Sequence, residues 1–263
     1  MQQFASQRNN LANEPGHWIL ARAGKKVLRP GGRQLTAKLI DALQISAQDH
    51  VIEIAPGLGF TAAMALSHRP ATYTGIDADS KAISHLRKKF GKQKTNFVHA
   101  DALASGLPAQ SATRVYGEAM LTMQTDRKKT EIIREAHRLL KKGGLYAIHE
   151  LGLAPEDIPE AEKSEVQKEL SRAIKVNARP LTVTEWSVLL TENGFRVKEI
   201  VVGSMRLLEM RRMVTDEGFF RTLRIAFNIL RNPAITKRVL DMRAVFGRYR
   251  SKMNAVMLVA EKV

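Results

Sequence analysis

Three groups of residues follow three successive apolar segments, and their types suit the binding of a nucleoside. Gly57 and Gly59 come directly after VIEIA at 51–55, while Asp77 and Asp101 end the next two apolar segments. Glycines allow a tight turn and bring the backbone close to a ligand. A carboxylate at Asp77 can accept hydrogen bonds from both hydroxyls of a ribose, and one at Asp101 can contact an adenine amino group.

Three further polar residues accompany the apolar segments. Glu53 lies inside the first one, where an isolated charge is costly to bury, so we expect it to shape and polarise a crevice. Glu118 ends the segment at 112–119, and His149 ends the one at 144–150 just before Glu150. A histidine titrates near neutrality and can take a proton from a substrate. Glu118 and His149 are therefore the predicted catalytic candidates, although a histidine bonded into a crevice wall is the commoner case.

The elements that position these residues alternate between strand and helix patterns. Strands are predicted at 51–55, 71–77, 96–101, 112–119, 144–150, 195–202 and 254–263, with helical stripes between most of them. Such alternation predicts an α/β fold with a doubly wound, mostly parallel, seven-stranded Rossmann-like sheet. Ligands of such sheets bind beyond the carboxyl ends of the strands, where the predicted site residues lie.

Helical lids are predicted outside this sheet. Residues 1–34 form an N-terminal lid segment, residues 35–203 and 253–263 form the core, and residues 204–252 form a helical insertion. The insertion carries two apolar stripes that we expect to roof a pocket, namely Phe219, Phe220, Leu223, Phe227 and Leu230, then Ile235, Val239, Met242, Phe246 and Tyr249. Inside the core, Thr182 and Glu185 have the spacing of a capping box for a helix that Gly194 ends.

Composition excludes several classes of protein. The chain of 263 residues has no cysteine, which excludes disulfides, thiolate nucleophiles and cysteine-bound metals, and no metal site is predicted. No signal peptide or transmembrane run is present, so a cytoplasmic location is expected. The net charge of +16 is concentrated at 1–33, with +5, and at 204–252, with +8. Such a surplus attracts nucleic acid, anionic lipid or an anionic small molecule.

The motifs together resemble those of the class I S-adenosylmethionine-dependent methyltransferases. The resemblance covers residues 35–203 and the last strand, and it depends on EIAPGLG (53–59), GIDAD (75–79), HADAL (99–103), VYGEAM (115–120) and LKKGGLYAIHE (140–150). It implies S-adenosyl-L-methionine as cofactor. The residues that it places around the cofactor are Glu53, Ala55, Gly57, Gly59, Asp77, Ala78, Asp101, Ala102 and Glu118. Ala55 stands where the family's loop usually has its first glycine. NAD is the rival cofactor, but its third glycine is missing after Gly59.

The acceptor is predicted by exclusion. The segment after the fourth strand, GEAMLTMQ, lacks the Asn/Asp-Pro-Pro-aromatic signature of amino-methylating enzymes, and the absence of cysteine excludes carbon-5 pyrimidine methylation. The helical insertion is similar to the substrate cover of small-molecule and lipid methyltransferases. The leading prediction is a methyltransferase for a small, apolar or anionic acceptor. The alternatives are an RNA methyltransferase that uses the basic ends and a non-catalytic S-adenosylmethionine-binding protein.

Overall fold

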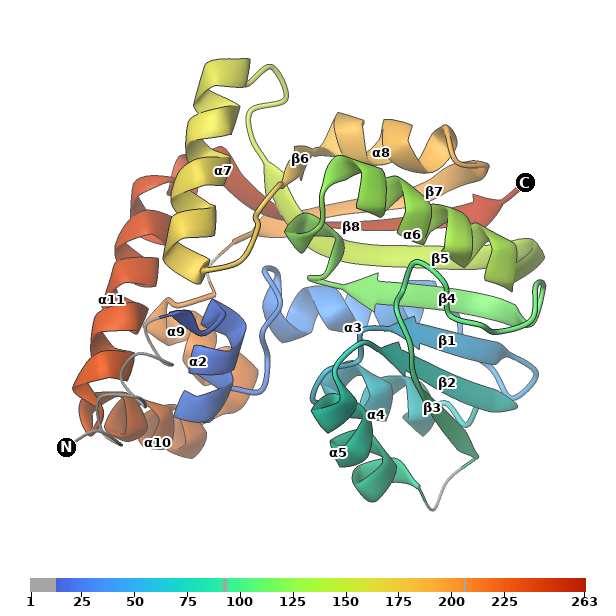
Figure 1. Cartoon of the computed structure of the whole chain (residues 1–263), viewed down its shortest axis with the longest axis horizontal. Helices are drawn as coiled ribbons and strands as arrows, with labels where there is room; N and C mark the ends of the chain where they lie inside the picture. The colour runs from blue at the N-terminus through green and yellow to red at the C-terminus, as the bar shows by residue number, and fades with distance from the viewer. Residues whose placement is uncertain (1–12, 92–93, 206) are drawn as a thin grey trace.

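One sheet of eight strands forms the centre of the molecule, in the order β3-β2-β1-β4-β5-β8-β7, with β6 paired to β5. The computed structural model describes residues 13–91, 94–205 and 207–263. The strands are β1 (His50–Ile54), β2 (Thr72–Asp77), β3 (Thr95–His99), β4 (Ala112–Glu118), β5 (Leu140–Leu153), β6 (Leu181–Thr182), β7 (Phe195–Ser204) and β8 (Met253–Lys262). β1 to β5 are parallel, and β8 runs antiparallel between β5 and β7 (Figure 1). The predicted mostly parallel sheet is confirmed, with the two-residue β6 as an addition.

Helices cover both faces of this sheet because the strand residues alternate between two apolar cores. α3 (Gly32–Ala42), α4 (Phe60–Ser67) and α5 (Ser80–Phe90) pack on one face, and α6 (Asp126–Leu139) and α8 (Val183–Thr191) pack on the other. The predicted capping box begins α8: the Glu185 amide donates to the Thr182 hydroxyl at 3.2 Å, and the Thr182 amide donates to the Glu185 carboxylate at 2.8 Å. Asp79 caps α5 with its side chain, which accepts the Lys81 amide at 2.8 Å.

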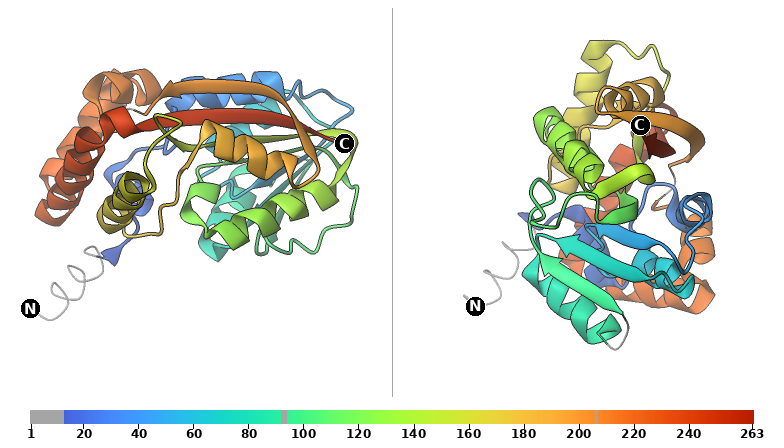
Figure 2. Two further views of the ribbon diagram at one scale, coloured as in Figure 1. Left: turned by 90° about the horizontal axis from the view of Figure 1, so that it is seen from above. Right: turned by 90° about the vertical axis from the view of Figure 1, so that its right-hand side faces the viewer.

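A helical layer lies beyond the carboxyl ends of the parallel strands (Figures 1 and 2). It consists of α2 (Gly16–Ala23), α7 (Glu160–Ile174), α9 (Met210–Glu217), α10 (Phe219–Leu230) and α11 (Pro233–Arg248), and the short 3₁₀ turns η1 (Leu121–Met123) and η2 (Arg250–Lys252) lie at its edges. An apolar cluster that includes Ile19, Ile225, Val239 and Met242 joins α2, α10 and α11. Among the described residues, no helix is long and apolar enough to cross a membrane.

The layer differs from the predicted lids in two respects. α7 belongs to it, because Leu170 and Ala173 pack toward α2 and α11, although the sequence placed this segment in the core. The prediction that both apolar stripes of residues 204–252 roof a pocket is wrong for α10. There the stripe that begins at Phe219 and Phe220 faces solvent, and Thr222 and Ile225 are buried instead. In the second stripe, Ile235, Val239, Met242 and Tyr249 are buried as predicted and Phe246 is half-buried. Residues 1–12 of the predicted N-terminal lid lie outside the described residues.

Candidate active site

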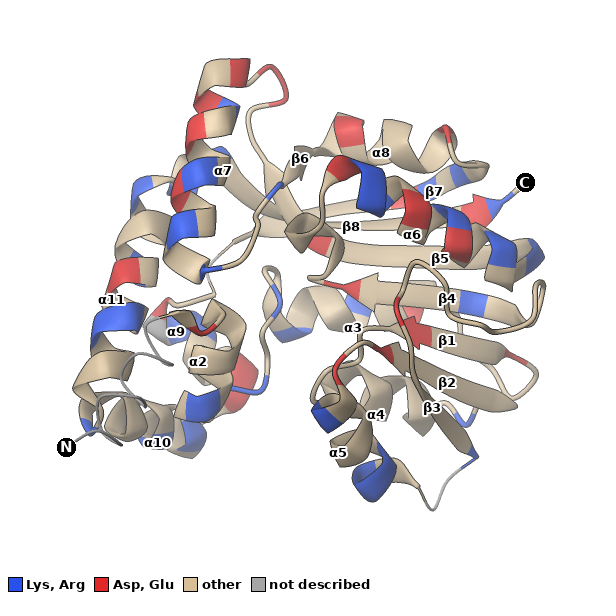
Figure 3. Ribbon diagram, viewed as in Figure 1, with Lys and Arg blue, Asp and Glu red and all other residues tan. Residues whose placement is uncertain are grey.

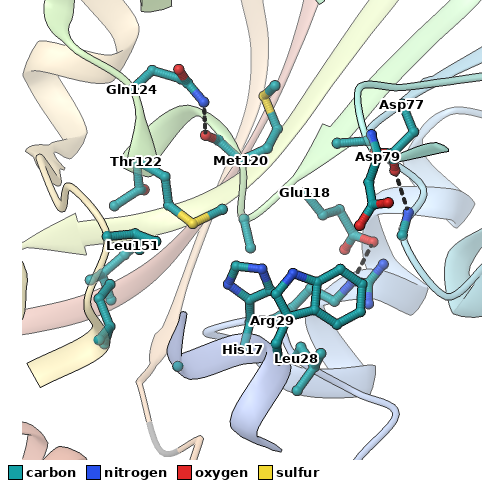
Figure 4. A pocket seen from close by; sticks show the side chains of 18 of the residues that line it. His17, Leu28, Arg29, Asp77, Asp79, Glu118, Met120, Thr122, Gln124 and Leu151 are labelled. Carbon is teal, nitrogen blue, oxygen red and sulfur yellow. Dashed lines mark hydrogen bonds and ion pairs between the residues drawn. The ribbon is translucent and has the colours of Figure 1, made fainter. Parts of the chain in front are cut away.

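A cavity of about 730 Å³ lies between the carboxyl ends of the strands and the helical layer. One half is formed by the segments after β1, β2, β3 and β4, and includes Ala55, Gly57, Asp77, Ala78, Asp101, Ala102 and Glu118. The other half is formed by the end of β5, by α7 and the segment after it, by the segment after β7 and by α11. Figure 4 shows the two sides, with Asp77 and Glu118 facing Thr122 and Leu151 across the cavity. Seven of the nine predicted cofactor-binding residues therefore line one continuous space.

The loop after β1 turns through three left-handed residues: Ala55 at φ +57°, Gly57 at φ +54° and Gly59 at φ +69°. A methyl group added at Gly57 would meet no other atom within 4 Å, so this glycine faces open space in the cavity. Ala55 lines the cavity as well, in a conformation that costs a residue with a side chain roughly 1–2 kcal/mol. The left-handed backbone at Ala55 therefore favours glycine, which is the residue that the family usually has at this position.

Gly59 has a different role from the one predicted, because it does not line the cavity. It is buried against α5, and a methyl group at this position would approach Leu86 Cδ2 to 2.5 Å and Phe90 Cε2 to 2.7 Å. Gly59 also forms the N-cap of α4. The second predicted glycine therefore allows helix packing behind the loop and does not approach a ligand.

Asp77 holds the glycine loop in place at the end of β2. Its carboxylate accepts the Gly57 amide at 3.0 Å through Oδ2 and the Asp79 amide at 2.9 Å through Oδ1. Each oxygen keeps further capacity to accept a hydroxyl. Burial raises the pKa of Asp77, against the lowering effect of these two amides. Asp101 lies in the same half of the cavity, on an exposed turn after β3, where its carboxylate accepts the Leu103 amide at 3.0 Å.

Glu53 was predicted to polarise the crevice, but it lies behind the cavity wall. Its side chain is buried in the sheet, where the Tyr73 hydroxyl donates to it and the Tyr116 hydroxyl donates at 2.8 Å. The β1–β4 register places Glu53 directly beside Tyr116. Burial raises the pKa of Glu53 to about 7, although the two hydroxyls and the Arg29 charge favour the carboxylate. The assignment of Glu53 to cofactor contact is therefore corrected: it is a partner of two buried tyrosines.

The Glu118 carboxylate accepts four side-chain hydrogen bonds from four separate segments. Oε1 accepts the Thr36 hydroxyl at 2.6 Å and the His149 Nδ1–H at 2.8 Å. Oε2 accepts Arg29 Nε at 3.1 Å and the Thr61 hydroxyl. Burial by itself would raise the pKa of Glu118, but the Arg29 guanidinium and the His149 hydrogen bond lower it to about 2. Glu118 is thus an anion at neutral pH and is suited to holding Arg29, not to taking a proton.

His149 was predicted as the other catalytic candidate, and its contacts do not favour a role as a base. The ring is fully buried and is absent from the cavity lining. The Gly31 amide donates to its Nε2 at 3.0 Å, which makes Nδ1 the protonated nitrogen that donates to Glu118. Both ring nitrogens are therefore occupied by the protein. This arrangement fits a positioning residue that links the N-terminal segment to β5.

Glu150, next to His149, organises the segment after β4. Its carboxylate accepts the amides of Met120, Leu121 and Thr122 at 2.9, 2.8 and 3.0 Å, and the Thr122 hydroxyl at 2.7 Å. Met120 and Thr122 line the cavity beside Glu118. A buried acid that satisfies three consecutive amides fixes this wall between the two halves of the cavity.

Several lining residues were missed by the sequence analysis. His17 and Trp18 of α2 and Arg29 of the following loop reach the cavity from the N-terminal segment, and Figure 4 shows Arg29 directed at Glu118. Burial lowers the pKa of His17, although the carboxylates of Glu14 and Asp79 oppose the shift. The sequence predicted residues 1–34 as a lid, but it did not indicate which side chains of that lid face the cavity.

The second half of the cavity is almost entirely apolar. Its side chains are Leu151, Leu170, Ile174, Val176, Ala178, Met205, Leu207, Met242 and Phe246. Thr122 and Gln124 supply polar atoms at its border with the first half, and Gln124 donates to the Met120 carbonyl at 3.5 Å. A molecule that fills this half is held chiefly by burial of apolar surface.

Comparison with known proteins places this geometry in a family. A family described as methyltransferase domain matches residues 51–144. An uncharacterized protein of Haemophilus influenzae is 33% identical over 83% of this chain and 87% of its own length. An O-methyltransferase of Pyrenophora dematioidea is 25% identical over 71% of this chain and 68% of its own. The structure of a methyltransferase from Geobacter sulfurreducens with S-adenosyl-L-homocysteine has a TM-score of 0.68 at 16% identity, covering 95% and 99% of the two chains.

The environment of Glu53 generates a prediction about stability. Because its folded pKa is raised from 4.5 to about 7, the folded chain binds this proton more tightly than the unfolded chain does. The resulting stability is present below pH 4.5 and is lost as the pH rises through 7, by roughly 3 kcal/mol in total. Glu53→Gln keeps an acceptor for both tyrosines and does not titrate. In urea titrations, the free energy of unfolding of the variant should therefore rise relative to that of the wild type from pH 5 to pH 8. The same pH dependence in both proteins would contradict the raised pKa of Glu53.

Proposed function

Because the chain belongs to the class I S-adenosylmethionine-dependent methyltransferases, we propose that it methylates a small, largely apolar or lipid-like acceptor. The observation that carries this proposal is the division of one cavity into a polar half with the family's glycine loop and strand-end acids and a second half lined by apolar side chains. The cofactor is S-adenosylmethionine.

The residues present fit the cofactor. Open space at Gly57 leaves room for its backbone to contact the methionine portion, and Asp77 has acceptor capacity beyond the two loop amides. Asp101 and Ala102 line the cavity where an adenine would follow the ribose. The Arg29 guanidinium, held by Glu118, supplies a positive charge at the methionine end for a carboxylate. These assignments are part of the proposal.

Held at Gly57, Asp77 and Asp101, S-adenosylmethionine would supply an activated methyl group to the acceptor and would leave as S-adenosylhomocysteine. The contribution of this chain is chiefly position. Glu150 fixes Met120 and Thr122 between the two halves, and Glu118 fixes Arg29 beside them. The helical layer covers the apolar half and excludes water. Proximity and orientation of this kind contribute up to about 7–11 kcal/mol in favourable cases.

An acceptor hydroxyl or ammonium must lose a proton, and His17 is placed to take it. Among the described residues, His17 is the histidine that lines the cavity. Burial lowers the pKa of His17, so the ring is neutral at physiological pH and can accept a proton. In this proposal His17 takes the role of base that the sequence assigned to Glu118 or His149.

A pair of glycine substitutions separates cofactor binding from folding. Gly57→Ala and Gly59→Ala both place an alanine at a left-handed φ, but only the Gly57 methyl group points into the cavity. Calorimetric titration with S-adenosylhomocysteine should show at least about tenfold weaker binding for Gly57→Ala with a small loss of stability. Gly59→Ala should lower the melting temperature more, because Leu86 and Phe90 must move. Equal effects of the two variants on binding would contradict this reading of the loop.

The apolar half is tested with an acid in its lining. Val176 is half-buried in the lining, so Val176→Asp should fold and place an unpaired charge beside an apolar acceptor. Transfer of a radiolabelled methyl group into organic-extractable acceptors should fall at least about tenfold in kcat/KM, with unchanged cofactor affinity. Val188→Asp on the exposed surface of α8 is the matched control. Label that enters only RNA or water-soluble anions, at the wild-type rate in Val176→Asp, would refute the proposal.

The role of His17 predicts a dependence on pH. With the acceptor found in that assay, the wild-type rate should stay constant down to a pH below 6.5, because the lowered pKa keeps His17 neutral. His17→Asn should lower kcat by about a hundredfold or more and should regain rate as the pH rises and the acceptor ionises. His68→Asn, an exposed histidine after α4, is the control. If His17→Asn leaves kcat and its pH profile unchanged, position alone drives the transfer.

A further inference from the structure

α10 carries an apolar surface that nothing in the described chain covers. Phe220 is 85% exposed and Leu230 74% exposed, and Phe219, Leu223 and Phe227 are each more than half exposed. At about 100° per residue, these five side chains fall within an arc of about 100° on one side of the helix. The opposite side is already used: Thr222 and Ile225 are buried, and Asn228 donates to the Ala23 carbonyl of α2 at 3.0 Å. The exposed stripe is therefore a second face, separate from the one that packs.

Basic side chains border this stripe. Arg224 and Arg231 lie on one flank, next to the apolar arc, and neither forms an ion pair with a described residue. The Arg231 guanidinium lies 5.3 Å from the centre of the Phe227 ring. α10 itself contains no acidic residue. Figure 3 shows further blue segments on the neighbouring helices at this end of the molecule.

The acids nearest to α10 are turned into the protein. Glu217, at the end of α9, accepts the Lys26 and Val27 amides at 2.7 and 2.8 Å, and its side chain is 1% exposed. Asp216 accepts the Arg33 amide at 2.9 Å. These acids serve the N-terminal segment, so neither offsets the charge of Arg224 and Arg231 beside the stripe, and the exposed acid of the adjacent α11 is Asp241. An apolar face bordered by arginines matches an anionic lipid surface in both hydrophobicity and charge.

From these contacts we infer that α10 docks the protein on an anionic lipid bilayer, with Phe219, Phe220, Leu223, Phe227 and Leu230 inserted at the headgroup–acyl boundary. The helix has 12 residues and a length of about 18 Å, so it lies in the interface and does not span it. A second copy of the chain fits less well. An antiparallel symmetric pairing of the stripes would bring the arginine flanks of two copies to the same side with no acid of α10 between them.

Docking would place the roof of the cavity at the bilayer. α10 packs on α2, and α2 contributes His17, Trp18 and Leu20 to the lining. An acceptor dissolved in the membrane would then be close to the apolar half of the cavity. This consequence rests on the proposed function, whereas the docking itself does not.

Vesicle flotation of the full chain, without cofactor or acceptor, tests the docking. The protein should bind phosphatidylcholine vesicles that contain phosphatidylglycerol, and should bind vesicles of phosphatidylcholine alone much more weakly. Phe220→Ser with Leu223→Ser should weaken partitioning at least about tenfold. Arg224→Gln with Arg231→Gln should weaken it about tenfold on the anionic vesicles only. Binding of S-adenosylhomocysteine should stay at the wild-type value in both variants, which shows that they are folded.

Matched controls keep the test specific. Val188→Ser with Val202→Ser removes two exposed apolar side chains on α8 and β7, and Lys141→Gln with Lys142→Gln removes the same charge at the start of β5, away from α10 (Figure 1). Both controls should bind vesicles as the wild type does. If the serine pair loses cofactor binding, the single variant Leu230→Gln replaces it. Absence of vesicle binding, or vesicle binding that the α10 variants leave unchanged, would overturn the inference. Two other results would also overturn it: a dimer that forms without lipid and that the serine pair dissociates, or RNA binding that depends on Arg224 and Arg231 but not on Phe220.

Discussion

The buried carboxylate of Glu118 is the interaction on which the rest of the site depends. An anion this deeply buried is stable only when donors surround it, and here the donors come from four separate segments. Thr36 brings α3 to it, Thr61 brings α4, Arg29 brings the N-terminal segment and His149 brings β5. The β4–β5 register already places His149 beside Glu118. This strand pairing and the charge of Glu118 therefore determine how the N-terminal segment packs on the sheet.

Buried acids of α9 also hold the N-terminal segment, on the side away from Glu118. Glu217 and Asp216 of α9 accept backbone amides of residues 26, 27 and 33, while the Arg29 side chain and the Gly31 amide lead to Glu118 and His149. The segment between α2 and α3 is therefore held from two sides by buried acids. Since it contributes Arg29 to the cavity and continues from α2, the first half of the cavity and its roof form one connected structure.

The sequence predicted the elements and the residues at their ends, but it did not predict the direction in which individual side chains point. Strand ends are set by local patterns, so Gly57, Asp77 and Asp101 were correctly predicted to lie in one crevice. The sheet and the α8 capping box were also predicted correctly. Gly59 and Glu53 were misassigned because packing decides their surroundings: Gly59 lies against Phe90 of α5, and Glu53 pairs with Tyr116 inside the sheet. Arg29 and His17 were missed because no periodic pattern shows which way an N-terminal cover folds back.

The α10 stripe shows how two apolar faces on one helix mislead a sequence argument. Phe219, Phe220 and Leu223 form the stronger stripe, and burial of the stronger stripe is the usual expectation for a helix in a soluble domain. The structure buries the weaker one, with Thr222 and Ile225, because Asn228 and Ile225 are the residues that fit the end of α2. The acids of α9 are committed to the N-terminal segment, so they cannot neutralise the arginines beside the exposed face. The internal bonding that holds the cavity roof therefore also leaves an apolar, basic surface directly outside it.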